Sequence, residues 1–169
     1  MAYSASSKEQ SMSIQRVVLT VMAVGALFFI PHSSRAQQPK GPLANVRSIK
    51  CTFPLMVAGT WGEKGPEVKE KPPTLREPLQ FDAINADEGT AELKSPYGKF
   101  DIIVRYAGGY LHFIQSFLDG PLHVTTIIEK KTASGKFKAM HSRHEVTDFA
   151  LIGFTSTPEQ YYGECEILK

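Results

Sequence analysis

From Val46 onward, the sequence repeats one pattern: a short run of apolar, aromatic and β-branched residues, followed by a turn rich in Gly, Pro, Asp or Asn. Such runs are typical of short strands, and the regular turns join them into an antiparallel sheet. We therefore predict an all-β domain, a small antiparallel meander barrel, with an open sandwich as the alternative. The predicted strands are Val46–Pro54, Leu79–Asn85, Thr90–Ser95, Lys99–Tyr106, Tyr110–Leu118, Leu122–Lys130, Lys136–Val146 and Tyr161–Ile167, with Met56–Gly62 as a candidate for one more.

Two stretches interrupt this pattern. Glu63–Pro78 is charged and broken by prolines, so we predict an exposed loop there. Leu151–Pro158 is predicted to be an irregular connection that leads into the last strand.

The N-terminal region contains an apolar segment, Val17–Ile30, which carries no charge, follows Arg16 and ends at Pro31. A membrane-spanning helix needs about 20 apolar residues, so this run is short for an anchor and is typical of a helical signal segment. The small residues of Ser34-Arg35-Ala36 predict cleavage after Ala36. We expect a signal peptide at 1–36, a flexible lead-in at 37–45 and one domain at 46–169. An uncleaved anchor is the alternative, and the domain is periplasmic or secreted in both cases.

The chain has two cysteines, Cys51 and Cys165, near the two ends of the predicted domain. In an oxidising compartment such a pair is expected to form a disulfide. The bond would stabilise the domain by about 4–5 kcal/mol in the loop-entropy model. It would also bring the last strand close to the first, as in a meander that closes on itself.

The charge of the predicted domain is balanced. The first 36 residues hold three basic residues and one acidic residue, and removing them from the totals of 19 and 17 leaves sixteen of each sign. This balance gives no reason to expect nucleic acid as a partner.

The sequence contains no recognisable catalytic, metal-binding or phosphate-binding motif, so we expect no enzyme activity, no cofactor and no metal. The most suggestive residues are His141 and His144, but residues three apart in a strand point to opposite faces. A hydrolase or isomerase that uses His144 or His141 is the alternative.

Hairpin pairing around Ser134 places His144, Ser142 and Thr126 on one face, together with Leu122, Val124 and Ile128. We predict that this mostly apolar face points inward and that His144 forms a polar spot inside the barrel with the two hydroxyl groups. A satisfied core histidine with no ligand is the other interpretation. The opposite face, with His123, Thr125 and Glu129, is predicted to be exposed to solvent.

Tyr161 and Tyr162 are adjacent in a predicted strand, so they point to opposite faces. One is expected to fill the core while the other is displayed as a candidate partner contact. For Tyr162 and for the single tryptophan, Trp61, we favour a structural role as plugs, that is, as side chains that fill space in the domain and stabilise it rather than contact a partner.

The stretch Ala133-Ser134-Gly135-Lys136-Phe137 resembles the short Ser-Gly loop of bacterial membrane-bound and periplasmic inhibitors of C-type lysozymes. Those inhibitors are small barrels with a disulfide that joins the start of the domain to its end. The resemblance implies that Ser134 and Lys136 contact the enzyme.

Together these features predict an exported, non-catalytic binding module of the bacterial envelope. A periplasmic protein similar to the lysozyme inhibitors is one alternative. A carrier of a small apolar ligand, lined by Phe113, Phe117 and His144, is the other. The expected partner is an envelope protein or a small molecule, with membrane contact restricted to an uncleaved N-terminal segment.

Overall fold

The computed structural model describes residues 41–95, 98–118, 120–146 and 155–169. The predicted signal segment and its cleavage site therefore lie outside the described residues. In the described part of the chain, no helix is long and apolar enough to cross a membrane. The strands are β1 (Ile49–Gly62), β2 (Gly65–Lys71), β3 (Leu79–Asn85), β4 (Thr90–Ser95), β5 (Gly98–Ala107), β6 (Tyr110–Ser116), β7 (Leu122–Lys131), β8 (Phe137–His144) and β9 (Glu159–Ile167).

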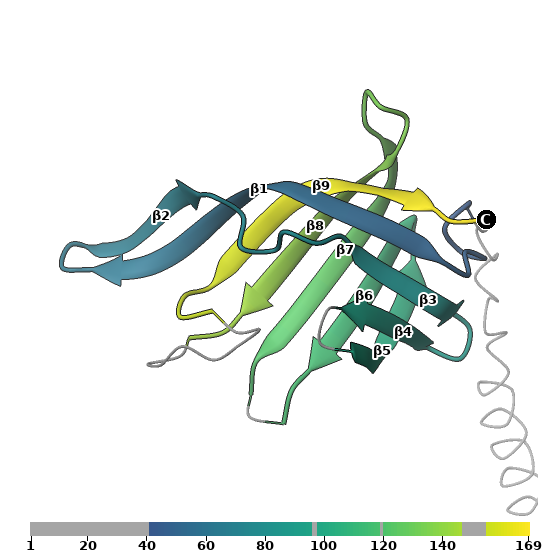
Figure 1. The fold of residues 1–169 in the computed structure, drawn as a ribbon, viewed down its shortest axis with the longest axis horizontal. Helices are drawn as coiled ribbons and strands as arrows, with labels where there is room; N and C mark the ends of the chain where they lie inside the picture. The colour runs from purple at the N-terminus through teal and green to yellow at the C-terminus, as the bar shows by residue number, and fades with distance from the viewer. Residues whose placement is uncertain (1–40, 96–97, 119, 147–154) are drawn as a thin grey trace, which may run out of the picture. The chain divides into compact units, whose positions relative to one another are not determined.

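All nine strands form one antiparallel sheet in the order β2-β1-β3-β4-β5-β6-β7-β8-β9, and β1 pairs with β9. This last pairing closes β1 and β3 to β9 into an eight-stranded barrel (Figure 1). The prediction of a closed meander is confirmed, and the open sandwich is excluded. Closure provides hydrogen-bond partners for the main-chain N–H and C=O groups that the two edge strands of an open sheet would leave unpaired.

β1 is a single long strand, where the sequence predicted one strand and a separate candidate. A bulge between Thr52 and Leu55 bends it, and the strand stays paired with β9 in the barrel as far as Ala58. From Met56 onward it also pairs with β2, and its end continues past the barrel with β2 as a projecting hairpin, which we call the arm (Figure 1). Gly163 of β9 lies where the bulge passes: a Cβ there would stand 1.9 Å from the carbonyl oxygen of Thr52.

The prediction of a loop over Glu63–Pro78 was wrong for its first half, because β2 occupies residues 65–71. A tight turn at Glu63 and Lys64 starts this strand, and Gly65 accepts the positive φ of 114° that the turn requires. β2 was missed because Val68 is its only large apolar residue, so it shows no apolar alternation. Trp61, predicted as a plug, lies on the arm and is 69% exposed.

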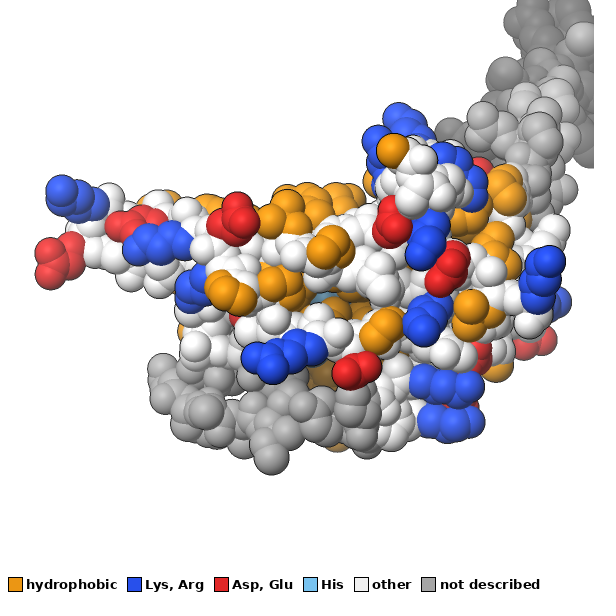
Figure 2. Space-filling view, turned by 45° about the horizontal axis from the view of Figure 1, so that its top comes forward, with side chains coloured by type: hydrophobic (Ala, Val, Ile, Leu, Met, Phe, Trp, Pro, Cys, Tyr) orange, Lys and Arg blue, Asp and Glu red, His pale blue; other side chains and the backbone are white. Residues whose placement is uncertain are grey.

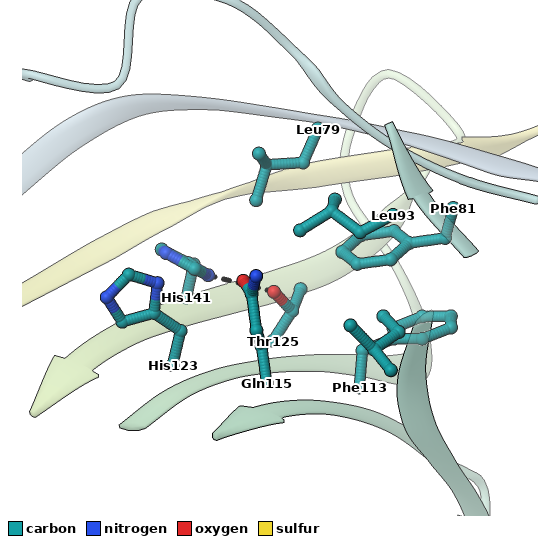
Figure 3. A pocket seen from close by; sticks show the side chains of 9 residues that line it. Leu79, Phe81, Leu93, Phe113, Gln115, His123, Thr125 and His141 are labelled. Carbon is teal, nitrogen blue, oxygen red and sulfur yellow. Dashed lines mark hydrogen bonds between the residues drawn. The ribbon is translucent and has the colours of Figure 1, made fainter. Parts of the chain in front are cut away.

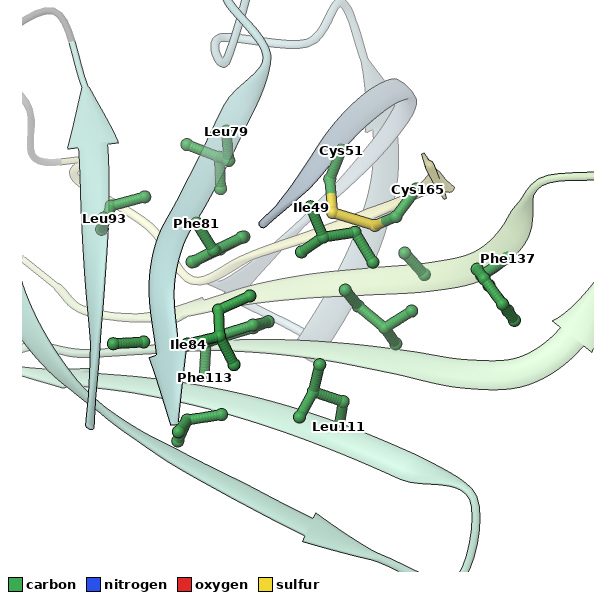
Figure 4. Close-up of a cluster of buried hydrophobic side chains, with 14 of the residues drawn as sticks. Ile49, Cys51, Leu79, Phe81, Ile84, Leu93, Leu111, Phe113, Phe137 and Cys165 are labelled. Atoms are coloured by element: carbon green, nitrogen blue, oxygen red, sulfur yellow. A yellow bond between two sulfur atoms is a disulfide. The ribbon is translucent and has the colours of Figure 1, made fainter. Parts of the chain in front are cut away.

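The barrel is filled by the inward side chains of its strands (Figure 4). Phe81 and Phe113 stack at the centre, with ring centroids 3.9 Å apart. Cys51 and Cys165 are fully buried and form the predicted disulfide across β1 and β9. The core residues are Leu43, Val46, Ile49, Cys51, Phe53, Met56, Leu79, Phe81, Ile84, Ala91, Leu93, Ile102, Val104, Leu111, Phe113, Ile127, Phe137, Ala139, Tyr161 and Cys165.

The residues before β1 pack against the barrel. Leu43, which falls in the stretch expected as a lead-in, is fully buried. Its backbone N–H donates to Oε1 of Glu129 at 2.8 Å, and the hydroxyl of Tyr106 donates to the same oxygen at 3.1 Å. One buried leucine and one carboxylate therefore hold residues 41–46 against the barrel.

The prediction of which face of β7 and β8 points inward was wrong. His123, Thr125 and Ile127 point into the barrel, whereas Thr126, Ser142 and His144 lie on the outside. The β7–β8 register also differs, because Thr126 lies opposite Met140 rather than Ser142. Both faces of these strands carry apolar and polar residues, so their alternation did not identify the core face.

Candidate binding surface

The outside of the barrel carries two adjacent cross-strand rows over β6, β7, β8, β9 and β1, and we call these rows the outer face. The pairing of the five strands places the members of each row side by side, and all are half-buried or exposed. The first row is Ile114, Val124, Ser142, Gln160 and Val57, and the second is His112, Thr126, Met140, Tyr162 and Leu55.

None of these ten residues is an acidic residue, a lysine or an arginine. Tyr162 is 39% exposed and lies between Leu55 and Met140, which are its partners on β1 and β8. Figure 2 shows the β1–β9 part of the molecule, where hydrophobic side chains gather along the top of the view. Depletion of charge around exposed aromatic and Met residues is typical of the central part of a protein interface.

The outside of β3, β4 and β5 has the opposite character. Lys94 contacts Asp82 at 2.5 Å, and Lys99 contacts Glu92 at 3.0 Å. Burial opposes ionisation of Asp82, but its hydrogen bond with Lys94 and its further polar partners lower its pKa. The outside of β3 to β5 therefore carries ion pairs, whereas the ten residues of the outer face carry no carboxylate, ammonium or guanidinium group; the next row on β8 and β9, Lys138 and Glu164, is charged and borders the outer face.

Three predicted contact residues, Thr126, Ser142 and Tyr162, belong to the outer face, and His144 lies next to it on β8. Thr126 accepts or donates a hydrogen bond with Nδ1 of His112 at 3.0 Å. These residues were predicted as a polar spot inside the barrel, apart from Tyr162. The structure brings them together on the outside instead.

A separate polar cluster lies inside the barrel, and two histidines form its centre. Nδ1 of His141 is 2.8 Å from Oγ1 of Thr125, and the rings of His141 and His123 meet edge to face with centroids 5.8 Å apart. Burial, with Arg143 and His123 nearby, lowers the pKa of His141 to about 3. Burial and Arg143 also lower the pKa of His123. The interior therefore favours neutral imidazoles.

Two carboxylates border this cluster. Glu145 accepts hydrogen bonds from the backbone N–H and the hydroxyl of Thr155 at 2.9 and 2.8 Å, and it lies 3.5 Å from Nε2 of His123. Glu159 accepts a hydrogen bond from the hydroxyl of Tyr161. Burial and this bond raise the pKa of Tyr161 to about 12, so Tyr161 fills the core as a neutral side chain.

The histidines, Thr125 and Gln115 line a cavity on one side, and apolar side chains line it on the other (Figure 3). Its volume is about 10 Å³, roughly the space that one water molecule needs. Pockets for small molecules are typically about 300–1,000 Å³. Of the predicted carrier residues, Phe113 lines this cavity, whereas Phe117 and His144 do not. Among the described residues, no cluster of His, Cys, Asp and Glu could hold a metal ion.

The predicted loop residues Ser134 and Lys136 lie at the tip of the β7–β8 hairpin. The hydroxyl of Ser134 donates to Oε2 of Glu164 at 2.7 Å, and Nζ of Lys136 lies 3.8 Å from Oε1 of Glu164 and 3.4 Å from Glu166. Hydrogen bonds from Ser134 and Thr132 lower the pKa of Glu164. The hydroxyl and the ammonium group thus converge on one carboxylate.

Comparison of the chain with models of known protein families, with curated proteins and with solved structures gives no match. The function of the chain is therefore inferred from its own residues and geometry.

Sequence reasoning placed Val124 on the same face as Thr126 and Ser142 but predicted that this face points inward, and it missed Ile114 and Leu55 as members of the outer face. Each is an ordinary strand residue. Their adjacency depends on a register across five strands, and local sequence does not specify it.

Proposed function

We propose that the chain is an exported, non-catalytic binding module of the bacterial envelope, and that the outer face binds another protein. The observation that carries this proposal is the contrast between the two sides of the barrel. The outer face has no charged residue among its ten, whereas β3 to β5 carry ion pairs between Lys and acidic residues. Contiguous exposed surface that combines apolar residues with an absence of charge is typical of interaction sites, and this supports a partner on the outer face.

Export is supported by two independent features. The apolar segment Val17–Ile30 has the length and flanks of a signal segment. The disulfide between Cys51 and Cys165 is the kind of bond that persists in an oxidising compartment.

The non-catalytic part of the proposal is supported by the environment of the buried histidines. His141 is 4% exposed, is held neutral by its surroundings and borders a cavity of water size. A general base must come within hydrogen-bond reach of a substrate, and no substrate-sized space adjoins this ring in the described cavity.

The proposal is tested by capturing partners from a bacterial envelope fraction with the oxidised protein. We expect Tyr162→Asp to abolish the capture of a recurrent partner, because it places a charge between Leu55 and Met140. Thr90→Asp, on the exposed outside of β4, is the matched control and should retain capture. Equal capture by both variants, at equal thermal stability, would reject the outer face as the binding surface.

A second candidate is an inhibitor of C-type lysozymes, and the hairpin tip favours it. Ser134 and Lys136 converge on the carboxylate of Glu164 of the same chain, and this supports a loop whose hydroxyl and ammonium groups can contact a carboxylate of an enzyme. A lysozyme turbidity assay tests it directly. Inhibition that is lost in Ser134→Ala and Lys136→Ala would favour this function over the first, and absence of inhibition by the parent protein would exclude it.

A further inference from the structure

The arm carries an unpaired sheet edge. Among the described strands, each barrel strand pairs on both sides, whereas β2 pairs with β1 alone. All residues of β2 are exposed except the half-buried Gly65, and the arm projects away from the barrel (Figure 1). An edge of this kind presents main-chain N–H and C=O groups that can accept another strand.

The hairpin geometry determines which of these groups are available. Gly62 and Gly65 flank the two-residue turn and form the first hydrogen-bonded pair, after which bonded and non-bonded pairs alternate. Val68, opposite Gly59, falls in a non-bonded pair, so its N–H and C=O point away from β1. The same holds for Glu70, while Pro66 offers its C=O alone.

The charge pattern of β2 selects one antiparallel pairing of this edge with itself. When Val68 lies opposite Val68 of a second copy, Glu67 faces Lys69 of that copy on one side of the two-fold axis, and Lys69 faces Glu67 on the other. The next registers that preserve the hydrogen bonds move one strand by two residues. In one direction this places Glu67 opposite Glu67, and in the other it places Lys69 opposite Lys69. Opposite charges directly across a sheet stabilise it and like charges destabilise it.

We propose that β2 is a dimerisation edge, and that two copies of the chain join their β2 strands antiparallel about Val68. The ladder would contain about four main-chain hydrogen bonds, because Val68 exchanges two with its counterpart and each Glu70 N–H donates to the C=O of Pro66 of the other copy. Each copy uses its one free edge, so the assembly closes at two copies.

Apolar contact adds to this ladder. Val68 is 72% exposed, and Trp61 lies on the same side of the arm. Gly59, opposite Val68, leaves that side open for the indole ring. The dimer would cover both valines, and it would leave the outer face of each barrel available for a partner.

Cysteine cross-linking of the full chain tests the register. Val68→Cys places two sulfurs across the axis, at the Cα separation of about 5.5 Å that a disulfide accepts. The native cysteines are bonded to each other and fully buried, so they do not compete. Glu70→Cys is the control, because the two copies of residue 70 would be roughly 13 Å apart along the strands. A covalent dimer with Val68→Cys and none with Glu70→Cys is expected.

Charge reversal then tests the complementarity. In the Val68→Cys background, Glu67→Lys and Lys69→Glu should each weaken dimerisation by about tenfold. Mixing these two variants, or combining both changes in one chain, should restore it. Equal cross-linking at positions 68 and 70, no cross-linking at 68, or single reversals without effect in chains of unchanged thermal stability would each overturn the proposal.

Discussion

Cys51 and Cys165 are register partners on β1 and β9 as well as partners in the disulfide. The covalent bond therefore closes the barrel at the same place as the hydrogen-bonded ladder. The two residues are 114 positions apart in the sequence, so the bond constrains almost the whole domain.

Replacing either cysteine tests this closure. Cys51→Ala and Cys165→Ala should each lower the free energy of unfolding by about 2–5 kcal/mol, because the unfolded chain regains the entropy of the open loop. The double replacement should cost no more than either single one. Denaturant unfolding measures the effect, and equal midpoints under oxidising and reducing conditions would contradict it.

Gly163 is required by the close passage of β1. Gly163→Ala should destabilise the protein by about 2 kcal/mol or more, because its Cβ would collide with the Thr52 carbonyl group and push the two strands apart. Gly59→Ala is the control, since the nearest atom to its Cβ would be 3.9 Å away. Equal melting temperatures for the two variants would contradict this prediction, because they would show that β1 and β9 move apart at Gly163 at little cost in free energy.

The adjacent tyrosines should respond differently to loss of their hydroxyl groups. Tyr161→Phe removes the partner of Glu159 and Thr74 in a fully buried site, and we expect a cost of about 1–3 kcal/mol. Tyr162→Phe, on the outer face, should change stability by about 0.5 kcal/mol or less. Urea unfolding of both variants decides the point, and equal losses would contradict the assignment of Tyr161 to the core.

His141 should make stability depend on pH. Its pKa is about 3 in the folded state against an ordinary value of 6.5, so the unfolded state binds the proton more readily. This contribution to stability is fully present above pH 6.5 and is lost as the pH falls toward 3, by up to about 1.4 kcal/mol per pH unit.

His141→Gln should therefore give a flatter stability profile between pH 6.5 and pH 3 than the parent protein. Ser142→Ala, which replaces a residue without a titrating group on the same strand, is the control and should leave the profile unchanged. Identical slopes in the parent and His141→Gln would show that His141 is not buried as a neutral ring.

The strands of the barrel, their meander order and the disulfide follow from short-range patterns and from one pair of cysteines. Short-range patterns do not predict which face of β7 and β8 points inward. The reason is that Thr125 and His141 are polar residues that point into the barrel and form a hydrogen bond with each other. Their burial becomes favourable only when both strands are in place. Local alternation therefore assigned the wrong face as the core.

The outer face was only partly predictable for a related reason. The alternation of Tyr161 and Tyr162 predicted that one of them is displayed, but the structural role favoured for Tyr162 was wrong, because Tyr162 is 39% exposed. Met140 and Leu55 join Tyr162 through a register that includes the β1 bulge. β2 was missed because four of its seven residues are charged and none of them is buried in the core.

Site-specific photo-cross-linking tests the central claim most directly. A photoreactive residue at Val124, on the outer face, should cross-link the protein to a recurrent envelope partner. The same residue at Glu92, on the charged outside of β4, should not. Cross-linking from Glu92 with none from Val124 would contradict the assignment of the outer face as the binding surface.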